Sequence, residues 1–148
     1  MVVMIIAIIA AIAIPRLSRG AAQASINAAA RDENILNKAA EMYRSEHWRY
    51  PGGVRVVSQL TQFTDDDGDP NPTRSRRYYL GPYLAAIPPA PIGWQKGATG
   101  VAQSPGAGIG WLYNPRNGQF RISLTAGDTP MPGDEIPEAV VEAVIEPP

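Results

Sequence analysis

The chain of 148 residues contains no cysteine, so a disulfide, a thiolate nucleophile and a cysteine-ligated zinc ion are all excluded. It also has no excess of basic residues, because 13 Lys and Arg stand against 14 Asp and Glu. A protein that binds nucleic acid needs positive charge to neutralise phosphates, so we expect no nucleic-acid partner. A chain of this length is enough for one domain with a modest core and for appendages beside it.

Proline is scarce in the first third of the chain: Pro15 is the only one before Pro51, and the other 14 lie at Pro51 or beyond. Proline breaks helices when it lies in their interior, so its absence favours a helix over residues 16–50. Its abundance afterwards favours turns, short strands and loops. We therefore predict an α+β fold, in which one long, bent N-terminal helix packs on a small antiparallel sheet.

Residues 1–14 (MVVMIIAIIAAIAI) carry no charge and form a long apolar run. In water such a run is an aggregation hazard, so we expect residues 1–20 to be a hydrophobic transmembrane and assembly helix. Fourteen helical residues reach only about 21 Å of the roughly 30 Å hydrocarbon layer, so the natural start is expected upstream of Met1. Two other interpretations are a signal peptide, which lacks its basic n-region here, and a core helix of a soluble protein, which needs a larger core.

Residues 21–50 continue the helix with an amphipathic composition rich in Ala, Glu, Arg, Asn and Lys. Pro15 and Gly20 weaken the helical hydrogen bonds, so a bend is expected between them, and the helix is expected to end at about Trp48, before Pro51. A stripe that recurs every three or four residues is expected to pack on the globular part. Its members are Leu17, Ala21, Ala24, Ala28, Arg31, Ile35, Ala39 and Met42.

Residues 51–124 are predicted to form a small β-rich globular domain. Within it, residues 54–63 fit either a strand that runs into a helical turn or a short helix throughout. The clearest hairpin covers Ile109 to Leu124, because apolar and polar residues alternate after the Asn-Pro-Arg-Asn-Gly turn. Residues 125–148 are acidic, rich in proline and without a basic residue, so we expect an extended or disordered tail.

Three segments resemble the superfamily of type IV pilins and type II secretion pseudopilins, and most of all its major, G-type pseudopilin. VVMIIAIIAAIAIPRLS (2–18) is similar to the inner part of the prepilin signature, with Pro15 at the family's proline. GPYLAAIPPAPIG (81–93) and GWLYNPRNGQFRISL (110–124) are similar to the Gly-Pro-Tyr-Leu segment and the closing hairpin of that pseudopilin. The family's leader, cleavage site, methylated N-terminal residue and glutamate should all lie just before Met1, and this sequence does not contain them.

The resemblance implies a pilin-like fold and a structural role: a membrane-stored subunit that assembles into a pseudopilus and drives protein export. If the true start lies upstream of Met1, the resemblance also implies processing by the prepilin peptidase. The implied partners are other copies of the chain, minor pseudopilins and the assembly platform. The implied location is the bacterial inner membrane, with the globular domain in the periplasm. The alternatives are a type IV pilus subunit for adhesion or motility and a membrane-tethered periplasmic binding module.

The apolar run also contains the residues that we expect to serve assembly. Small side chains let neighbouring helices approach closely, which favours a packing role for the alanines of the run. These residues are Ala7, Ala10, Ala11 and Ala13, with Pro15 at the end of the run.

Asp65, Asp67 and Asp69 are the candidate metal ligands, because alternate acidic residues supply the oxygen ligands of calcium loops. The spacing is not that of an EF-hand, since Pro70 and Arg76 stand where Gly and the bidentate Glu are needed. The resemblance adds weight to a calcium site, because major pseudopilins of the secretion type bind calcium in a loop of this domain. The alternative is a solvated acidic turn beside Arg74, Arg76 and Arg77.

No catalytic residue is predicted, and we expect the protein not to be an enzyme. His47 is the only histidine, has no Ser or Cys nucleophile pattern near it, and is expected at the surface where the helix ends. Glu41 and Glu46, on a helix whose inner face is packed, do not supply the carboxylate pair in a cleft that a hydrolase needs. The aromatic residues are expected to fill the core rather than to stack on sugars or bases. They are Trp48, Trp94, Trp111, Tyr78, Tyr79 and Tyr83.

Overall fold

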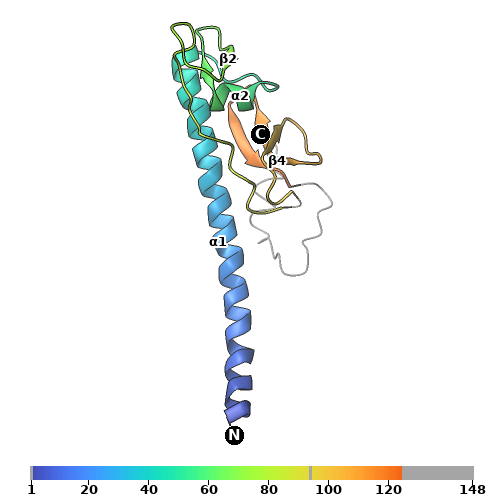
Figure 1. Ribbon diagram of the computed structural model, residues 1–148. Helices are drawn as coiled ribbons and strands as arrows, with labels where there is room; N and C mark the ends of the chain where they lie inside the picture. Colours follow the sequence, from blue (N-terminus) through green and yellow to red (C-terminus); the bar gives the residue numbers. More distant parts are fainter. Residues whose placement is uncertain (1, 94, 125–148) are drawn as a thin grey trace.

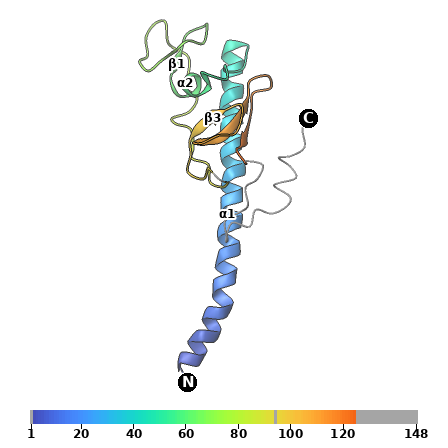
Figure 2. The same cartoon turned by 90° about the vertical axis from the view of Figure 1, so that its right-hand side faces the viewer.

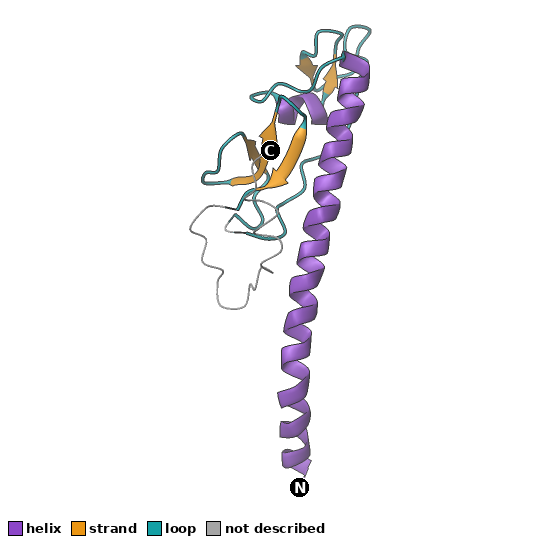
Figure 3. Cartoon of the chain, turned by 180° about the vertical axis from the view of Figure 1, so that it is seen from behind, coloured by secondary structure: helices purple, strands orange, loops and turns teal. Residues whose placement is uncertain are grey.

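The computed structural model describes residues 2–93 and 95–124, and for residues 2–20 it describes the backbone alone. Its main feature is helix α1, Val2–His47, which has 46 residues and is therefore about 69 Å long. The globular domain packs on the C-terminal part of α1, and the N-terminal part extends beyond the domain (Figures 1 and 3). The predicted α+β class and the long N-terminal helix are confirmed. The predicted tail at 125–148 lies outside the described residues.

Helix α1 runs without interruption through Pro15 and Gly20. Its dark-blue N-terminal end leans away from the axis of the rest, as seen in Figure 2. The helix ends at His47, since Trp48 has φ 60° and its N–H donates to the carbonyl of Arg44 at 2.8 Å. A left-handed residue closes a helix in this way, and the predicted end at about Trp48 is confirmed.

The buried face of α1 differs from the predicted stripe. The core residues of α1 lie three, four or seven positions apart, as on one face of a helix: Ala29, Leu36, Ala40, Tyr43 and His47 are buried. Of the predicted stripe, Ala39 is buried, but Ile35 is 44% exposed and Met42 is 52% exposed. The predicted face is therefore wrong by about one residue, or about 100° of rotation. Leu36 and Tyr43 are large and point to the domain, which fixes the rotation of the helix.

A short helix and a two-stranded sheet follow α1. Helix α2, Val56–Thr61, leads into strand β1, Phe63–Thr64, which pairs with β2, Pro70–Asn71, in antiparallel register. Of the two alternatives for residues 54–63, the short helix is therefore closer, although a strand follows it. The chain between β1 and β2 is the acidic loop, residues 65–69, which packs close to the C-terminal end of α1 (Figure 1).

The second sheet contains β3, Gly100–Ala102, β4, Ile109–Asn114, and β5, Gln119–Ile122, in the order β3-β4-β5. Strands β4 and β5 are antiparallel, with Trp111 opposite Ile122 and Tyr113 opposite Phe120, which confirms the predicted hairpin. Strands β3 and β4 are parallel. The predicted antiparallel pairing is therefore found within the hairpin, but the described residues form two sheets instead of one, and the larger sheet is mixed.

The close approach of two backbone segments explains why the sequence of β3 carries no strand pattern. A Cβ at Gly100 would lie 2.2 Å from the carbonyl oxygen of Gly108, and one at Gly110 would lie 2.3 Å from that of Ala98. Glycine is thus required where these segments approach, and a glycine-rich segment lacks the alternation that marks a strand. The core between this sheet and α1 is apolar, with Trp111, Phe120 and Leu36 buried.

In the described part of the chain, no helix is both long and apolar enough to cross a lipid bilayer. This finding contradicts the predicted transmembrane helix at 1–20, and with it the expected single-pass location in the inner membrane with a periplasmic domain. The physical reason is the length of the run: fourteen apolar residues reach about 21 Å, and Pro15, Arg16 and Arg19 follow them.

Candidate functional site

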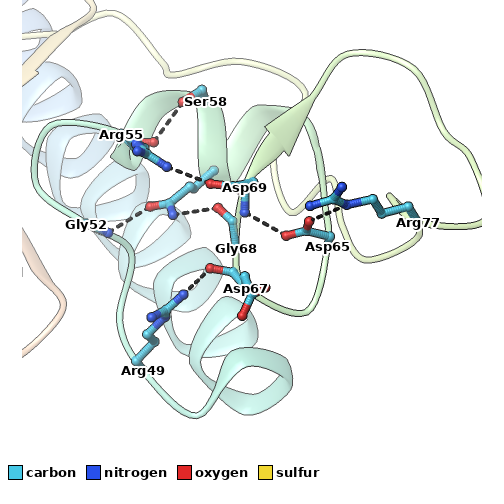
Figure 4. A network of polar contacts seen from close by, with 10 residues as sticks. Arg49, Gly52, Arg55, Ser58, Asp65, Asp67, Gly68, Asp69 and Arg77 are labelled. Atoms are coloured by element: carbon cyan, nitrogen blue, oxygen red, sulfur yellow. Dashed lines mark hydrogen bonds and ion pairs between the residues drawn. The ribbon is translucent and has the colours of Figure 1, made fainter.

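The acidic loop is organised around the buried carboxylate of Asp65, which is 4% exposed. One oxygen accepts a hydrogen bond from the backbone N–H of Asp69 at 2.9 Å, and the other accepts one from Nε of Arg77 at 2.9 Å (Figure 4). Burial raises the pKa of this carboxyl, but these two hydrogen bonds and the charge of Arg77 outweigh burial and hold the pKa below its usual value. Asp65 is therefore an ionised anchor that closes the loop on itself.

The other two candidate ligands, Asp67 and Asp69, have different partners. Asp69 pairs with Nη1 of Arg55, just before α2, at 2.7 Å. Asp67 is exposed, and its backbone carbonyl accepts a hydrogen bond from Arg49 (Figure 4). The sequence pattern identified the three aspartates and named Arg77 as a neighbour, but it did not indicate Arg49 or Arg55, which come from segments before the loop.

Gln59 of α2 holds the loop from the inside. Its Nε2 donates to the carbonyl of Gly68 at 2.8 Å, and its Oε1 accepts the N–H of Gly52 at 2.7 Å. Gly68 has φ 77°, and a Cβ there would lie 2.2 Å from the hydroxyl of Tyr43, so only glycine fits. The sequence did not predict these two hydrogen bonds of Gln59. The one sequence signal for them was the glycine within the acidic segment, which marks a left-handed turn.

The residues of the loop do not fit a calcium ion. Calcium takes six to eight oxygens around one point. Asp65 and Asp69 instead turn to two different arginines, Asp66 accepts a hydrogen bond from the hydroxyl of Tyr79, and Asp67 is exposed. Among the described residues, no group of three or more His, Cys, Asp or Glu side chains is placed to hold a metal. The positive charges that offset the loop's carboxylates come from the chain's own arginines.

His47 is buried, so the prediction of a surface position is wrong. Its Nε2 lies 2.9 Å from the hydroxyl oxygen of Thr64, and its ring stacks on Tyr43 with centroids 4.0 Å apart. Burial lowers the pKa of His47 below its ordinary value. Nδ1 has no hydrogen-bond partner among the described residues. Because Thr64 is itself fully buried, the pair joins α1 to β1 and does not face a substrate.

The remaining candidate catalytic groups have structural partners. Glu41 accepts a hydrogen bond from the hydroxyl of Tyr50 at 2.7 Å and pairs with Arg44 at 3.4 Å. Glu46 accepts one from the hydroxyl of Tyr83. These contacts tie α1 to the segments that follow it.

The aromatic residues divide between the core and the surface. Trp111 is buried and donates its indole N–H to the carbonyl of Pro88 at 2.8 Å, as the core prediction requires. Trp48 is 92% exposed, and Tyr79 is 46% exposed, so the prediction is wrong for them. Tyr78 and Tyr83 are half-buried, and Trp94 lies outside the described residues.

The exposed side of α1 is the second candidate site. Ala21, Ala24, Ile35 and Met42, which belong to the predicted packing stripe, are exposed, and we call them the outer stripe. The predicted assembly residues precede them in the same helix: Ala7, Ala10, Ala11, Ala13 and Pro15 all lie within α1.

Comparison of the chain with family models, with curated proteins and with solved structures found no match. The family resemblance therefore rests on the three sequence segments 2–18, 81–93 and 110–124.

Proposed function

We propose that the protein is a structural subunit of a helical filament of the pseudopilus kind, in which copies pack together through helix α1, and that it is not an enzyme. The observation that carries the proposal is that α1 extends beyond the domain and begins with an apolar run. An apolar helix without a partner is costly in water, so it needs other helices to cover it.

The outer stripe supports the same proposal within the described side chains. Ile35 and Met42 are large apolar residues on a face that the domain leaves uncovered. Ala21 and Ala24 continue that face with small side chains, and small residues let helix backbones come close. A second copy of α1 can therefore cover apolar surface that is exposed in the single chain.

The geometry of such contacts favours a filament over a closed pair. When the outer stripe of one copy meets a different face of the next, the contact is heterologous, and a heterologous contact that does not close produces a helical assembly. The helices would then form the centre of the rod, with the domains around it. The family resemblance implies that growth of this rod would drive protein export.

Charge substitution in the outer stripe tests the proposal. Ile35→Asp and Met42→Asp each place a carboxylate on a side chain that is about half exposed, so the domain should lose less than about 1 kcal/mol of stability. Assembly should be lost, because a buried unpaired charge between helices costs far more. Asn34→Asp is the matched control, since Asn34 is exposed but lies about 100° round the helix from Ile35.

The measurement is sedimentation and electron microscopy of filaments from cells that produce each variant. Cysteines introduced at Ala7 and Ala13 add a direct readout, because the chain has no cysteine of its own and a ladder of crosslinked multimers can come only from these positions. Filaments of equal length from Ile35→Asp, Met42→Asp and Asn34→Asp, or the absence of any ladder, would overturn the proposal.

A further inference from the structure

The outer face of the second sheet carries a polar groove. In β4 and β5, Leu112 pairs with Arg121 and Asn114 with Gln119, and these pairs lie on the face opposite the core residues. The turn residue Arg116 also lines the groove, and the hollow measures about 420 Å³. The groove is therefore built from both strands and the turn of the hairpin, which is a well-packed part of the domain.

The groove is positively charged. Arg116 and Arg121 are among its lining residues, amides such as Gln103 and Asn117 lie beside them, and none of the described residues that line the groove carries a carboxylate. Neither arginine forms an ion pair with another described residue. Arg121 also interacts with the charge of Glu33 in α1: burial raises the pKa of Glu33, and the charge of Arg121 opposes that rise without an ion pair between them. Two guanidinium groups with amides beside them suit an extended ligand that carries carboxylates.

The chain itself contains such a ligand directly after β5. Residues 125–148 hold six carboxylates and no basic residue, whereas residues 1–124 hold all 13 Lys and Arg and only eight Asp and Glu. The carboxylates of this segment are Asp128, Asp134, Glu135, Glu138, Glu142 and Glu146. The charges of the molecule are thus divided between a basic body and an acidic C-terminal segment.

We propose that the acidic C-terminal segment, residues 125–148, docks in the Arg116–Arg121 groove of its own chain. An extended chain covers up to about 3.3 Å per residue, so Asp128 can reach Arg121 and Asp134 can reach Arg116. Because β5 and the segment are joined by two residues, the segment is present at a high effective concentration at the groove. The docked segment covers the outer face of the sheet, which a neighbouring subunit could otherwise use.

A spin label in the segment tests the docking in the full chain. Ala139→Cys gives a single labelling site, because the sequence has no cysteine, and a non-ionic detergent keeps the apolar run covered and the chain monomeric. The label should broaden the amide signals of Gln103, Leu112 and Arg121, and leave those of residues 56–61 in α2 sharp. The broadening should fall at least severalfold in 0.5 M NaCl, which screens the charges.

Variants of the groove identify the contact. The double variant Arg116→Gln, Arg121→Gln should abolish most of the broadening while the signals of the core residues keep their positions. The double variant Arg74→Gln, Arg76→Gln removes the same charge from the loop after β2 and should leave the broadening unchanged. Sharp groove signals in the labelled wild-type chain would overturn the proposal.

Equal broadening in both double variants would also overturn it, since the arginines of the groove would then not be the contact. A mixed sample distinguishes docking within one chain from docking between chains. If an isotope-labelled chain without the spin label is broadened by a spin-labelled partner, the segment binds between subunits and the proposal fails.

Discussion

The two sheets of the domain are held together by different kinds of contact. The sheet β3-β4-β5 turns an apolar face to α1, on which Trp111, Tyr113 and Phe120 are buried. The sheet β1-β2 consists of two-residue strands, and its acidic loop is held by the ion pairs of Asp65 and Asp69 and by the amide of Gln59. The contrast shows that one small domain can contain a part that depends on buried area and a part that depends on charge.

The largest expected effect on stability comes from a substitution in the apolar core of the sheet β3-β4-β5. Phe120→Ala removes a fully buried ring that packs on Tyr113 with centroids 4.5 Å apart, so the free energy of unfolding should fall by about 3–5 kcal/mol in urea titrations. Leu112→Ala, on the other face of the same hairpin and half-buried, should cost about 1 kcal/mol. Equal losses for the two variants would mean that the inner face is not the core of the domain.

A substitution among the charged contacts of the acidic loop should lower the free energy of unfolding by less. Asp65→Asn removes the ion pair with Arg77 and weakens the bond to the Asp69 amide, so the domain should lose about 1–3 kcal/mol. Hydrogen exchange should become faster in residues 63–71 and stay slow in β4 and β5. Asp67→Asn is the control, because the side chain of Asp67 is exposed and should change little. A uniform acceleration across both sheets would contradict the division between them.

The third prediction concerns the pH dependence of stability, which tests the contact between His47 of α1 and Thr64 of β1. Burial lowers the pKa of His47 from its ordinary 6.5, so the unfolded chain takes up the proton first as the pH falls. The backbone of Asp66 and the charges of Glu46 and Asp65 oppose the lowering of this pKa, and the charge of Arg49 adds to it. The stability that His47 contributes is therefore complete above about pH 6.5, decreases below that value, and stops changing once the pH is below the folded-state pKa.

Urea unfolding of the wild type and of His47→Phe, measured at steps between pH 7.5 and 4.5, checks this prediction. The ring of Phe can keep the stacking on Tyr43 but cannot titrate. The variant should lose the decrease that the wild type shows below pH 6.5. Asp65 does not interfere, since its pKa is held below its usual 3.8. The same pH profile for both proteins would assign the decrease to another group.

The smallest expected effect concerns calcium. Because Arg55 and Arg77 already pair with the loop's buried and half-buried carboxylates, millimolar calcium and a chelator should give the same melting temperature. A ligand that binds the folded chain alone would add roughly 2.7 kcal/mol at 100 times its dissociation constant, so binding would be easy to detect. A higher melting temperature in calcium, lost in Asp69→Ala, would restore the calcium site.

The sequence predicts some elements of the domain and not others. The hairpin was predictable, because residues of alternating polarity flank a turn whose Gly118 has φ 71°. The parallel strand β3 was not, since Gly100 and its neighbours carry no alternating pattern. The rotation of α1 depends on which of Ile35 and Leu36 faces the domain, and a stripe of similar apolar residues cannot decide between neighbours one position apart.

The acidic loop was predictable as a loop but not as a site. The pattern Asp65, Asp67, Asp69 shows the carboxylates, whereas the partners Arg49, Arg55 and Gln59 are brought to it by the end of α1 and by α2. Which cation satisfies a carboxylate is decided by tertiary contacts, so a spacing rule could not distinguish an ion from an arginine. His47 was missed for the same reason, because its burial depends on Thr64 of β1.

Helix α1 also has a mechanical consequence. The described core contacts of the helix begin at Ala29, and further along Asn37 accepts the backbone N–H of Phe120 at 2.6 Å. Pro15 and Gly20, the two positions at which the helical ladder is weakest, both precede that contact region. Bending at those positions would change the direction of the N-terminal arm without moving the contacts that begin at Ala29. A pull along the axis would reach the domain through the remaining hydrogen bonds of the helix.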